Sequence, residues 1–364
     1  MLTGFGTRCF RETRLAKASL TSDICMVFAI GRRVSPQTPA PTIVGNLLEE
    51  AYEQFRNSDE GTVATYIPEL GKADPRLFGI CVASVDGQIF EVGDCDVEFT
   101  IQSISKPFVY AMALTEHGSA KVYGRVGVEP SGDAFNSIVL DQKTNRPFNA
   151  MVNAGAIAAA SLIEGSTVSE RSEKQLAVFS AAAGRQLRID ESVYRSETET
   201  GHRNRAIAWL MLNFGMIEGN VDDILSLYFQ QCSILVSARD LAVMGATLAN
   251  MGVNPLTGEN VFEMACIQDV LSVMFTCGMY DYSGEWAFRV GVPAKSGVAG
   301  GILGVVNRQL GIGTYSPKLD ARGNSVRGVK VCTFLSEELG LHAFNFMNHG
   351  SHFLKNLMER DSNH

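Results

Sequence analysis

The sequence lacks the patterns that hold a structural metal ion or a disulfide framework. It contains no Cys-x-x-Cys pair, and no histidine stands at metal-binding spacing from another candidate ligand. Most of the cysteines lie in apolar surroundings, which predicts buried thiols in a reducing, cytoplasmic compartment. The cysteines are Cys9, Cys25, Cys81, Cys95, Cys232, Cys266, Cys277 and Cys332. We therefore expect no metal site.

Two further absences narrow the class of partner. No apolar run approaches the roughly 18 residues that a membrane helix needs. The formal net charge is −8 with a pI of about 5.4, and no dense stripe of lysine and arginine runs through the main body. Such a chain lacks the electrostatic footprint of a nucleic-acid-binding protein. Small-molecule chemistry is therefore favoured, with neither a membrane nor a nucleic acid as partner.

The chain has 364 residues, of which 46% are hydrophobic, and is long enough to bury a large core. The proline- and threonine-rich stretch 35–42 is typical of a linker. Residues 1–42 are therefore predicted to be a poorly ordered extension, and 43–358 a catalytic domain. Residues 1–40 are rich in arginine, which is also typical of a targeting segment; an upstream start codon, with Met26 as the true start, explains the bias equally well.

The pattern of the body predicts an α+β fold. An amphipathic helix is expected from Ile43, and Asp86-Gly87 indicates a hairpin between two strands. Helical patterns dominate from about 120 to 270. Strands are expected again within 287–308, 310–315 and 325–335, before a last helix from about Ser336. The sheet should therefore combine both chain ends around a helical insert.

The stretch 102–107 places a serine, a lysine and a proline at the head of an apolar helix. Pro107 is tolerated only in the first helical turn, so Ser103 should lie at or just before a helix start, with Gly118 as a stop signal. Lys106 then lies over the same face as Ser103. Burial would lower the lysine pKa, so Lys106 can take the serine proton, while free first-turn N–H groups can stabilise an oxyanion.

A bare Ser-x-x-Lys pattern occurs about once by chance in a chain of this length and often marks only a capping serine with a surface lysine. Its context strengthens the hypothesis here. Penicillin-recognising enzymes pair Ser-x-x-Lys with a later Lys-Thr-Gly on a strand. Lys295-Ser296-Gly297 stands in such a predicted strand. A second lysine opposite Lys106 is expected to repel its charge and to help keep it neutral.

Six stretches of the sequence, including those around Ser103 and Lys295, closely resemble the serine-dependent glutaminase family. This family shares the β-lactamase and transpeptidase fold. The resemblance covers about residues 43 to 345 with the motifs in the family's order. The stretches are "YIPEL" (66–70), "QSISKP" (102–107), "EPSG" (129–132), "FNAMVNAGAI" (148–157), "CGMYDYSG" (277–284) and "PAKSGVAGGI" (293–302). The resemblance implies hydrolysis of L-glutamine to L-glutamate and ammonia through a γ-glutamyl ester on serine, without a cofactor, in a homodimer or homotetramer.

Carried over motif by motif, the resemblance implies a role for each site residue. Ser103 would be the nucleophile, Lys106 its base and Tyr280 a proton-transfer residue near the leaving amide. The backbone of Val298 would donate to the oxyanion, and Gly297 beside it would permit a close approach. The remaining substrate contacts would be Tyr66, Asn153, Glu197, Asn204 and Tyr228.

The residue types suit free glutamine, which presents an ammonium, a carboxylate and an amide. Glu197 can pair with the ammonium, and the neutral asparagines and tyrosines can bind the other groups without adding charge. Several of these residues can also have a purely structural role. Asn153 can cap a helix, Tyr228 can be core packing, and Glu197 can belong to a solvated loop. Glu199 and Tyr282 are the local competitors of Glu197 and Tyr280.

Two other functions remain open at the level of the sequence. One is another serine acyl hydrolase of the same fold, such as a β-lactamase or a transpeptidase, which would be exported. The other is a non-catalytic binding module, from which Ser103 or Lys106 would be missing. The presence of both residues favours the enzyme.

Overall fold

The computed structural model describes residues 42–132 and 136–345. All of these belong to the unit of the chain that begins at Pro41. The predicted extension 1–42 lies outside the described residues except for its last residue, Thr42, and so does the end of the predicted catalytic range beyond 345.

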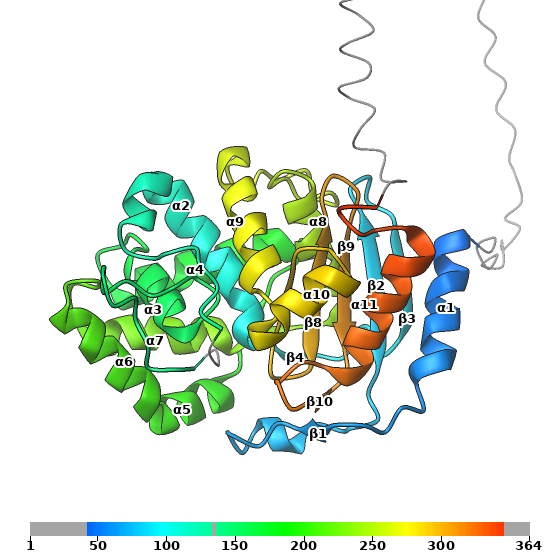
Figure 1. Ribbon diagram of the computed structural model, residues 1–364, viewed down its shortest axis with the longest axis horizontal. Coiled ribbons are helices and arrows are strands. Elements are labelled where there is room, and N and C mark those ends of the chain that lie inside the picture. The colour runs from blue at the N-terminus through cyan, green and yellow to red at the C-terminus, as the bar shows by residue number, and fades with distance from the viewer. Residues whose placement is uncertain (1–41, 133–135, 346–364) are drawn as a thin grey trace, which may run out of the picture. The chain divides into compact units, whose positions relative to one another are not determined.

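A five-stranded antiparallel sheet forms the centre of one half of this unit, in the order β3-β2-β9-β8-β7 (Figure 1). Its strands are β2 (Gly79–Ser84), β3 (Ile89–Gly93), β7 (Ala294–Ser296), β8 (Gly301–Val306) and β9 (Leu310–Tyr315). The predicted hairpin at Asp86-Gly87 joins β2 to β3, with Gly87 at φ 86°. The prediction that both chain ends build the sheet is confirmed, because β2 pairs with β9, more than 200 residues further along the chain.

Helices α1 (Ile43–Phe55), α10 (Ser283–Arg289) and α11 (Val326–Leu339) pack with one face of the sheet. The prediction of strands across 325–335 and at the start of 287–308 is wrong here. Ser325 caps α11 by accepting from Gly328 N, and Gly328, Val331 and Leu335 are buried at helical spacing. Their burial against the sheet outweighs the β-propensity of the valines. Consequently no new helix begins at Ser336, and α11 ends at Leu339.

Helix α8 (Ala238–Ala249) lies across the opposite face of the sheet. Its start is fixed by a capping box between Ser237 and Asp240. The contact with β9 is unusually close, because a Cβ atom at Gly313 would lie 2.1 Å from the Ala238 carbonyl oxygen. Glycine is therefore required on this strand, since any side chain would separate the helix from the sheet.

The other half of the unit is helical, and of its helices α9 contacts the sheet at β7 (Figure 1). Its helices are α2 (Lys106–Tyr123), α3 (Asn153–Ser161), α4 (Val168–Ala183), α5 (Glu191–Thr200), α6 (His202–Asn213), α7 (Val221–Cys232) and α9 (Met264–Cys277). The predicted stop at Gly118 appears as a break inside α2, where this glycine has φ 74°. Central α2 is buried from Lys106 to Leu114, as its apolar pattern predicts.

Short elements complete the described unit. They are the strands β1 (Thr62–Val63), β4 (Phe99–Thr100), β5 (Arg188–Ile189), β6 (Ile234–Val236) and β10 (Lys318–Leu319), and the 3₁₀ turns η1 (Leu70–Lys72), η2 (Gln102–Ser105) and η3 (Tyr280–Tyr282). Strand β6 pairs with both β4 and β5, so the chain just before η2 is tied to the helical half.

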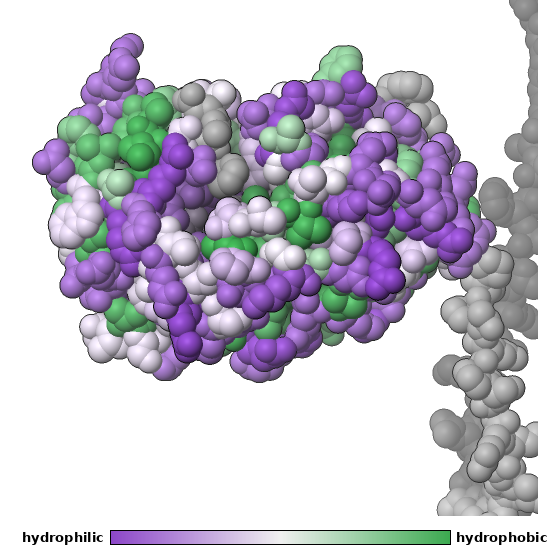
Figure 2. Space-filling model, turned by 90° about the horizontal axis from the view of Figure 1, so that it is seen from below, coloured by the Kyte–Doolittle hydropathy of each residue, from purple (hydrophilic) through white to green (hydrophobic). Residues whose placement is uncertain are grey.

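The surface seen in Figure 2 is a mosaic in which hydrophobic residues are separated by hydrophilic ones. The apolar residues gather inside instead, in clusters on both faces of the sheet and among the helices. The six cysteines of the described residues are free and buried, which confirms the expectation of buried thiols for them. Within 42–132 and 136–345, none of the helices is long and apolar enough to cross a bilayer.

Candidate active site

The predicted nucleophile lies in a sharp turn at the head of α2. Ser103 belongs to η2, and α2 follows at Lys106 with Pro107 in its first turn, as the sequence predicts. Gln102, directly before Ser103, has φ 51°, a left-handed conformation that a residue other than glycine rarely adopts. Strain of this kind is often concentrated at functional sites. Ser103 is only 6% exposed, so the turn presents its side chain to a nearly enclosed space.

Lys106 is completely buried, and its amine is held by neutral acceptors. Its Nζ donates to Asn153 Oδ1 at 2.7 Å and to the Met151 carbonyl oxygen at 3.2 Å. Burial lowers the pKa of Lys106 to about 8, since the interior disfavours the ammonium form. Asn153 in turn donates through Nδ2 to Asn204 Oδ1 at 3.0 Å, so the lysine, both asparagines and their helices form one polar network.

Lys295 is the second buried lysine, on β7. Its Nζ donates to the carbonyl oxygens of Gly278 at 2.9 Å and Ser296 at 2.8 Å. Burial holds the pKa of Lys295 well below its usual value, and the positive charge of Lys106 lowers it further. Burial is the first cause of the lowered pKa of both lysines, and the two buried amines also repel each other's charge.

Tyr280 lies at the site, and its local competitor Tyr282 does not. The Tyr280 hydroxyl donates to the Ser296 carbonyl oxygen at 2.9 Å and also hydrogen-bonds with Ser103. Burial raises the pKa of Tyr280 far above its usual value, so it stays protonated. Tyr280 has φ 58°, a second strained residue at this site. Tyr282 packs instead in the core on the far face of the sheet, with the Arg322 guanidinium over its ring.

A pocket of about 260 Å³ opens over Ser103. Seven of the nine residues named as site candidates line it, and the other two contact its lining: Lys106 through Asn153 and Tyr280 through Ser103. The lining comprises Tyr66, Gln102, Ser103, Asn136, Asn153, Glu197, Thr200, Gly201, Arg203, Asn204, Tyr228, Cys232 and Val298. The residues come from both halves of the unit, so the pocket lies where the halves meet.

Glu197 supplies a carboxylate to this pocket. It belongs to α5, a regular helix, so its reading as part of a solvated loop is wrong. Glu197 is 7% exposed, whereas Glu199 on the same helix is exposed to solvent. The Tyr66 hydroxyl lies 3.1 Å from Glu197 Oε1 and 2.7 Å from Gln102 Oε1. Burial raises the pKa of Glu197, while hydrogen bonds with Tyr66 and Gln102 oppose that shift.

Asn153 and Tyr228 both lie at the pocket. Asn153 is the first residue of α3, and Val152 occupies the cap position, so the asparagine side chain is free to hold Lys106. Tyr228 is buried in α7, as expected for core packing, yet it also lines the pocket. Both descriptions therefore apply to Tyr228.

Val298 lines the pocket just after β7. A Cβ atom on the neighbouring Gly297 would lie 2.9 Å from the Ile101 carbonyl oxygen and 3.1 Å from the Ile104 side chain. Glycine therefore lets the end of β7 press against the turn that holds Ser103. This contact brings the backbone of Val298 to the pocket.

Six lining residues were not identified from the sequence: Gln102, Asn136, Thr200, Gly201, Arg203 and Cys232. Gln102 and Arg203 each directly precede a predicted site residue, and Cys232 lies one helical turn after Tyr228. That adjacency was the available signal. Asn136 lies in a loop that no local pattern connects with the site. In the described part of the chain, no group of three or more potential ligand side chains could hold a metal ion.

Comparisons with known proteins identify the family to which this chain belongs. A family model described as Glutaminase matches residues 61–344. A glutaminase of Trichormus variabilis is 56% identical over 306 residues, which are 84% of this chain and 91% of the relative. A glutaminase of Microcystis aeruginosa is 58% identical over 300 residues, covering 82% and 89% of the two chains.

Solved structures agree with the sequence relatives. The native form of Mglu superposes with a TM-score of 0.82 at 43% identity, covering 85% of this chain and 75% of that one. The probable glutaminase ybaS superposes with a TM-score of 0.81 at 40% identity, covering 83% and 98% of the two chains. The antiparallel sheet with flanking helices is thus the β-lactamase-like fold of these proteins. The chain belongs to the glutaminase family of hydrolases.

Proposed function

We propose that this protein hydrolyses L-glutamine to L-glutamate and ammonia through an ester on Ser103. Family membership supports the substrate, and the relatives named above are glutaminases. The observation that supports the mechanism is Lys106: a fully buried amine, with a pKa of about 8, three residues after the candidate nucleophile. Such an amine is a strong enough base and is largely free of its proton under mildly alkaline conditions.

The pocket matches the charges of free glutamine. Glu197 is its buried carboxylate and would pair with the α-ammonium group. Asn204, Tyr66 and Tyr228 offer neutral donors and acceptors to the α-carboxylate. Asn153 holds Lys106 through its oxygen and would direct its amide toward the substrate. Because each polar group of the ligand meets a partner, analogues that lack one group would leave a buried group unpaired and bind weakly.

In the acylation step, Ser103 Oγ attacks the side-chain amide carbon of glutamine while its proton passes to Lys106. The carbonyl oxygen becomes an oxyanion, which the backbone N–H groups of Ser103 and Val298 would stabilise. The C–N bond then breaks, and the nitrogen takes a proton relayed by Tyr280 and Lys106. Ammonia leaves, and a γ-glutamyl ester remains on Ser103.

In the deacylation step, a water molecule attacks the ester carbon and gives its proton to Lys106. The bond to Ser103 Oγ breaks, and the serine recovers its proton. The products of this step are glutamate and the unchanged enzyme. The complete reaction therefore consumes one glutamine and one water molecule. No cofactor takes part in any of these steps.

Replacing the nucleophile tests the mechanism. Ser103→Ala should lower ammonia release by at least about 10⁴-fold, because no ester can form, while calorimetry still detects glutamine binding. Ser169→Ala, at an exposed serine of α4, is the matched control and should retain full turnover. Near-normal ammonia release from Ser103→Ala contradicts the ester mechanism. Acylation of Ser103 by a cephalosporin, with no ammonia from glutamine, would favour the β-lactamase or transpeptidase alternative instead.

We also propose that the chain forms a homodimer or homotetramer and acts in the cytoplasm. Trp209 on α6 is 57% exposed and Phe214 just after it is 40% exposed, and a subunit contact would cover such side chains. Free cysteines fit a reducing compartment. Light scattering on the purified protein measures the oligomeric state. Cell fractionation tests the cytoplasmic location.

A further inference from the structure

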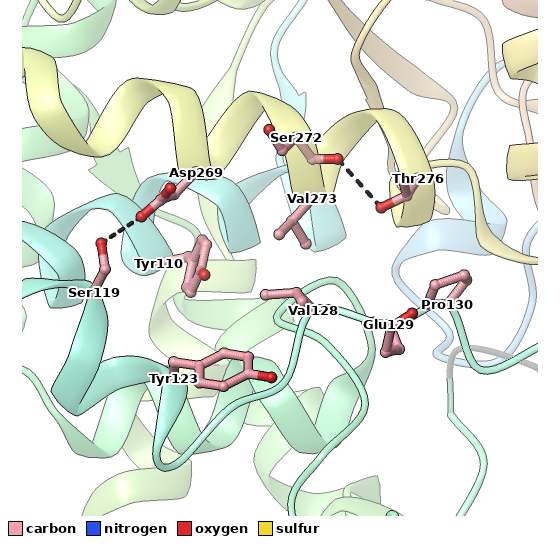
Figure 3. Close-up of a pocket in the computed structure, with 10 residues that line it drawn as sticks. All are labelled: Tyr110, Ser119, Tyr123, Val128, Glu129, Pro130, Asp269, Ser272, Val273 and Thr276. Atoms are coloured by element: carbon pink, nitrogen blue, oxygen red, sulfur yellow. Dashed lines mark hydrogen bonds between the residues drawn. The ribbon is translucent and has the colours of Figure 1, made fainter.

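A second cavity, of about 500 Å³, lies between α2, α9 and the loop that contains Val128 and Glu129 (Figure 3). It shares no lining residue with the candidate active site. Its two helices carry the candidate catalytic groups at their ends: α2 begins at Lys106, and α9 ends directly before Gly278 and Tyr280. The mechanism proposed above assigns no role to this cavity.

Tyr110 is the buried polar group that faces this space. Its side chain is only 3% exposed and belongs to the main core cluster. Figure 3 shows its hydroxyl directed into the cavity, between α9 and Val128. Tyr110 lines the cavity, and no hydrogen bond joins its hydroxyl to another of the described side chains that line it. The hydroxyl is therefore available to accept or donate a hydrogen bond to a molecule in the cavity.

Two carboxylates give the cavity its charge. Asp269 lies at one end, where it accepts a hydrogen bond from Ser119, and Glu129 lies at the other end (Figure 3). The backbone of Glu129 is held by Phe148 and Asn149, which fixes the position of this loop. The Glu129 carboxylate has no ion pair among the described residues. No lysine or arginine lines the cavity, so its formal charge is −2.

The surface between the carboxylates is apolar or presents acceptors. Val128 and Val273 supply methyl groups, and the Tyr110 and Tyr123 rings flank them (Figure 3). The hydroxyls of Ser272 and Thr276 already donate to carbonyl oxygens of α9, so they offer lone pairs to a ligand. Arg146 covers one face of the Tyr123 ring but is outside the lining. The cavity thus has anionic ends and an apolar middle.

We propose that this cavity is a binding site for a small aliphatic diamine. Ammonium groups at the two ends of the ligand pair with Asp269 and Glu129, and the methylene chain lies against the valines. The oxygen of the Tyr110 hydroxyl accepts a hydrogen bond from the nearer ammonium group. Ammonium groups also interact favourably with the faces of aromatic rings.

Calorimetric titration of the full chain with putrescine tests this site. Butylamine has one ammonium and butanediol none, so we expect affinity to fall in that order. Asp269→Asn and Glu129→Gln should each weaken putrescine binding about tenfold, as expected for loss of a charge-assisted hydrogen bond. Glu337→Gln, at an exposed carboxylate on α11, is the charge-matched control and should leave the affinity unchanged.

Tyr110→Phe separates a binding role from a structural one. Because the hydroxyl faces the cavity and not the packed core, this variant should unfold at the same denaturant concentration as the parent protein yet bind putrescine more weakly. The proposal is wrong if no heat appears up to about 10 mM putrescine, a concentration at which even weak paired charges would bind. It is also wrong if butanediol binds as well as putrescine. Ammonia release by the same samples reports on the active site separately.

Discussion

Lys106 shows at the scale of one residue how burial favours the neutral form of an amine. Its amine donates to the amide oxygen of Asn153 and to the backbone carbonyl oxygen of Met151, which are both neutral acceptors. Neutral acceptors compensate an ammonium ion only partly for the loss of water, so the neutral amine is favoured. Glu197 nearby acts in the opposite sense but is too weak to restore the usual pKa.

The first prediction concerns the pH dependence of kcat/KM for glutamine. The base must be neutral, and its pKa is about 8, so activity should rise with pH through that value and level off above it. At pH 7 about a tenth of the molecules have neutral Lys106, so the rate should be about a tenth of the plateau. Tyr280 keeps its proton across this range, because burial raises its pKa. Initial rates of ammonia release across the range measure the profile.

Lys121→Met provides the control for this profile, since Lys121 is an exposed lysine on the same helix. Its variant should show the same inflection as the parent protein. A rate that is flat between about pH 6 and about pH 9 would mean that Lys106 is not the base.

At the scale of elements, the contact between α8 and β9 depends on the absence of side chains. Gly311 and Gly313 alternate along β9 on the side that faces α8, and a Cβ atom on either would lie 2.1 Å from a backbone carbonyl oxygen of the helix. The sheet that carries β7 and Lys295 is therefore backed directly by a helix backbone. Positions of this kind tolerate no added volume.

The second prediction is that Gly313→Ala lowers the free energy of unfolding by about 3 kcal/mol, because the new methyl group must push α8 away. Gly304→Ala on the adjacent strand β8 is the matched control. Its Cβ atom would meet Ile312 at 3.5 Å, an ordinary contact, so its cost should stay below about 1 kcal/mol. Urea unfolding followed by circular dichroism measures both. Equal stability of the two variants would contradict the proposed packing.

At the scale of the whole described unit, the candidate site joins two halves. Ser103 and Lys106 stand at the head of α2, Val298 follows β7 of the sheet, and Glu197 comes from α5 of the helical half. A ligand held by all of them binds only the folded arrangement. Binding should therefore stabilise the protein by mass action.

The third prediction uses Ser103→Ala, which cannot turn over its substrate. L-glutamine at about 100 times its dissociation constant should raise the free energy of unfolding of this variant by about 2.7 kcal/mol. Adding Glu197→Gln removes the partner of the ammonium group, so the same glutamine concentration should then stabilise by only about 1 kcal/mol. Chemical unfolding with and without glutamine measures both values. Equal stabilisation of the two proteins would exclude Glu197 as the ammonium partner.

Part of this structure could be predicted from the sequence, because it depends on interactions between residues that are close together in the chain. Pro107 fixes the helix start because its ring fits only a first turn, and Asp86-Gly87 fixes a hairpin because glycine accepts the left-handed turn. The spacing of Ser103 and Lys106 likewise follows from a single helical turn. These features depend only on residues near one another in the chain.

Tertiary structure decided the rest. The segment that became α11 contains valines that favour a strand, yet it is helical because Val331 and Leu335 bury on one face against the sheet. The contacts between Tyr66 and Glu197, and between Lys106 and Asn153, join residues 131 and 47 positions apart. The sequence by itself determined which side chains can do the chemistry. Only the packing of the two halves sets their distances and removes water from Lys106, because burial depends on the whole fold and not on neighbouring residues.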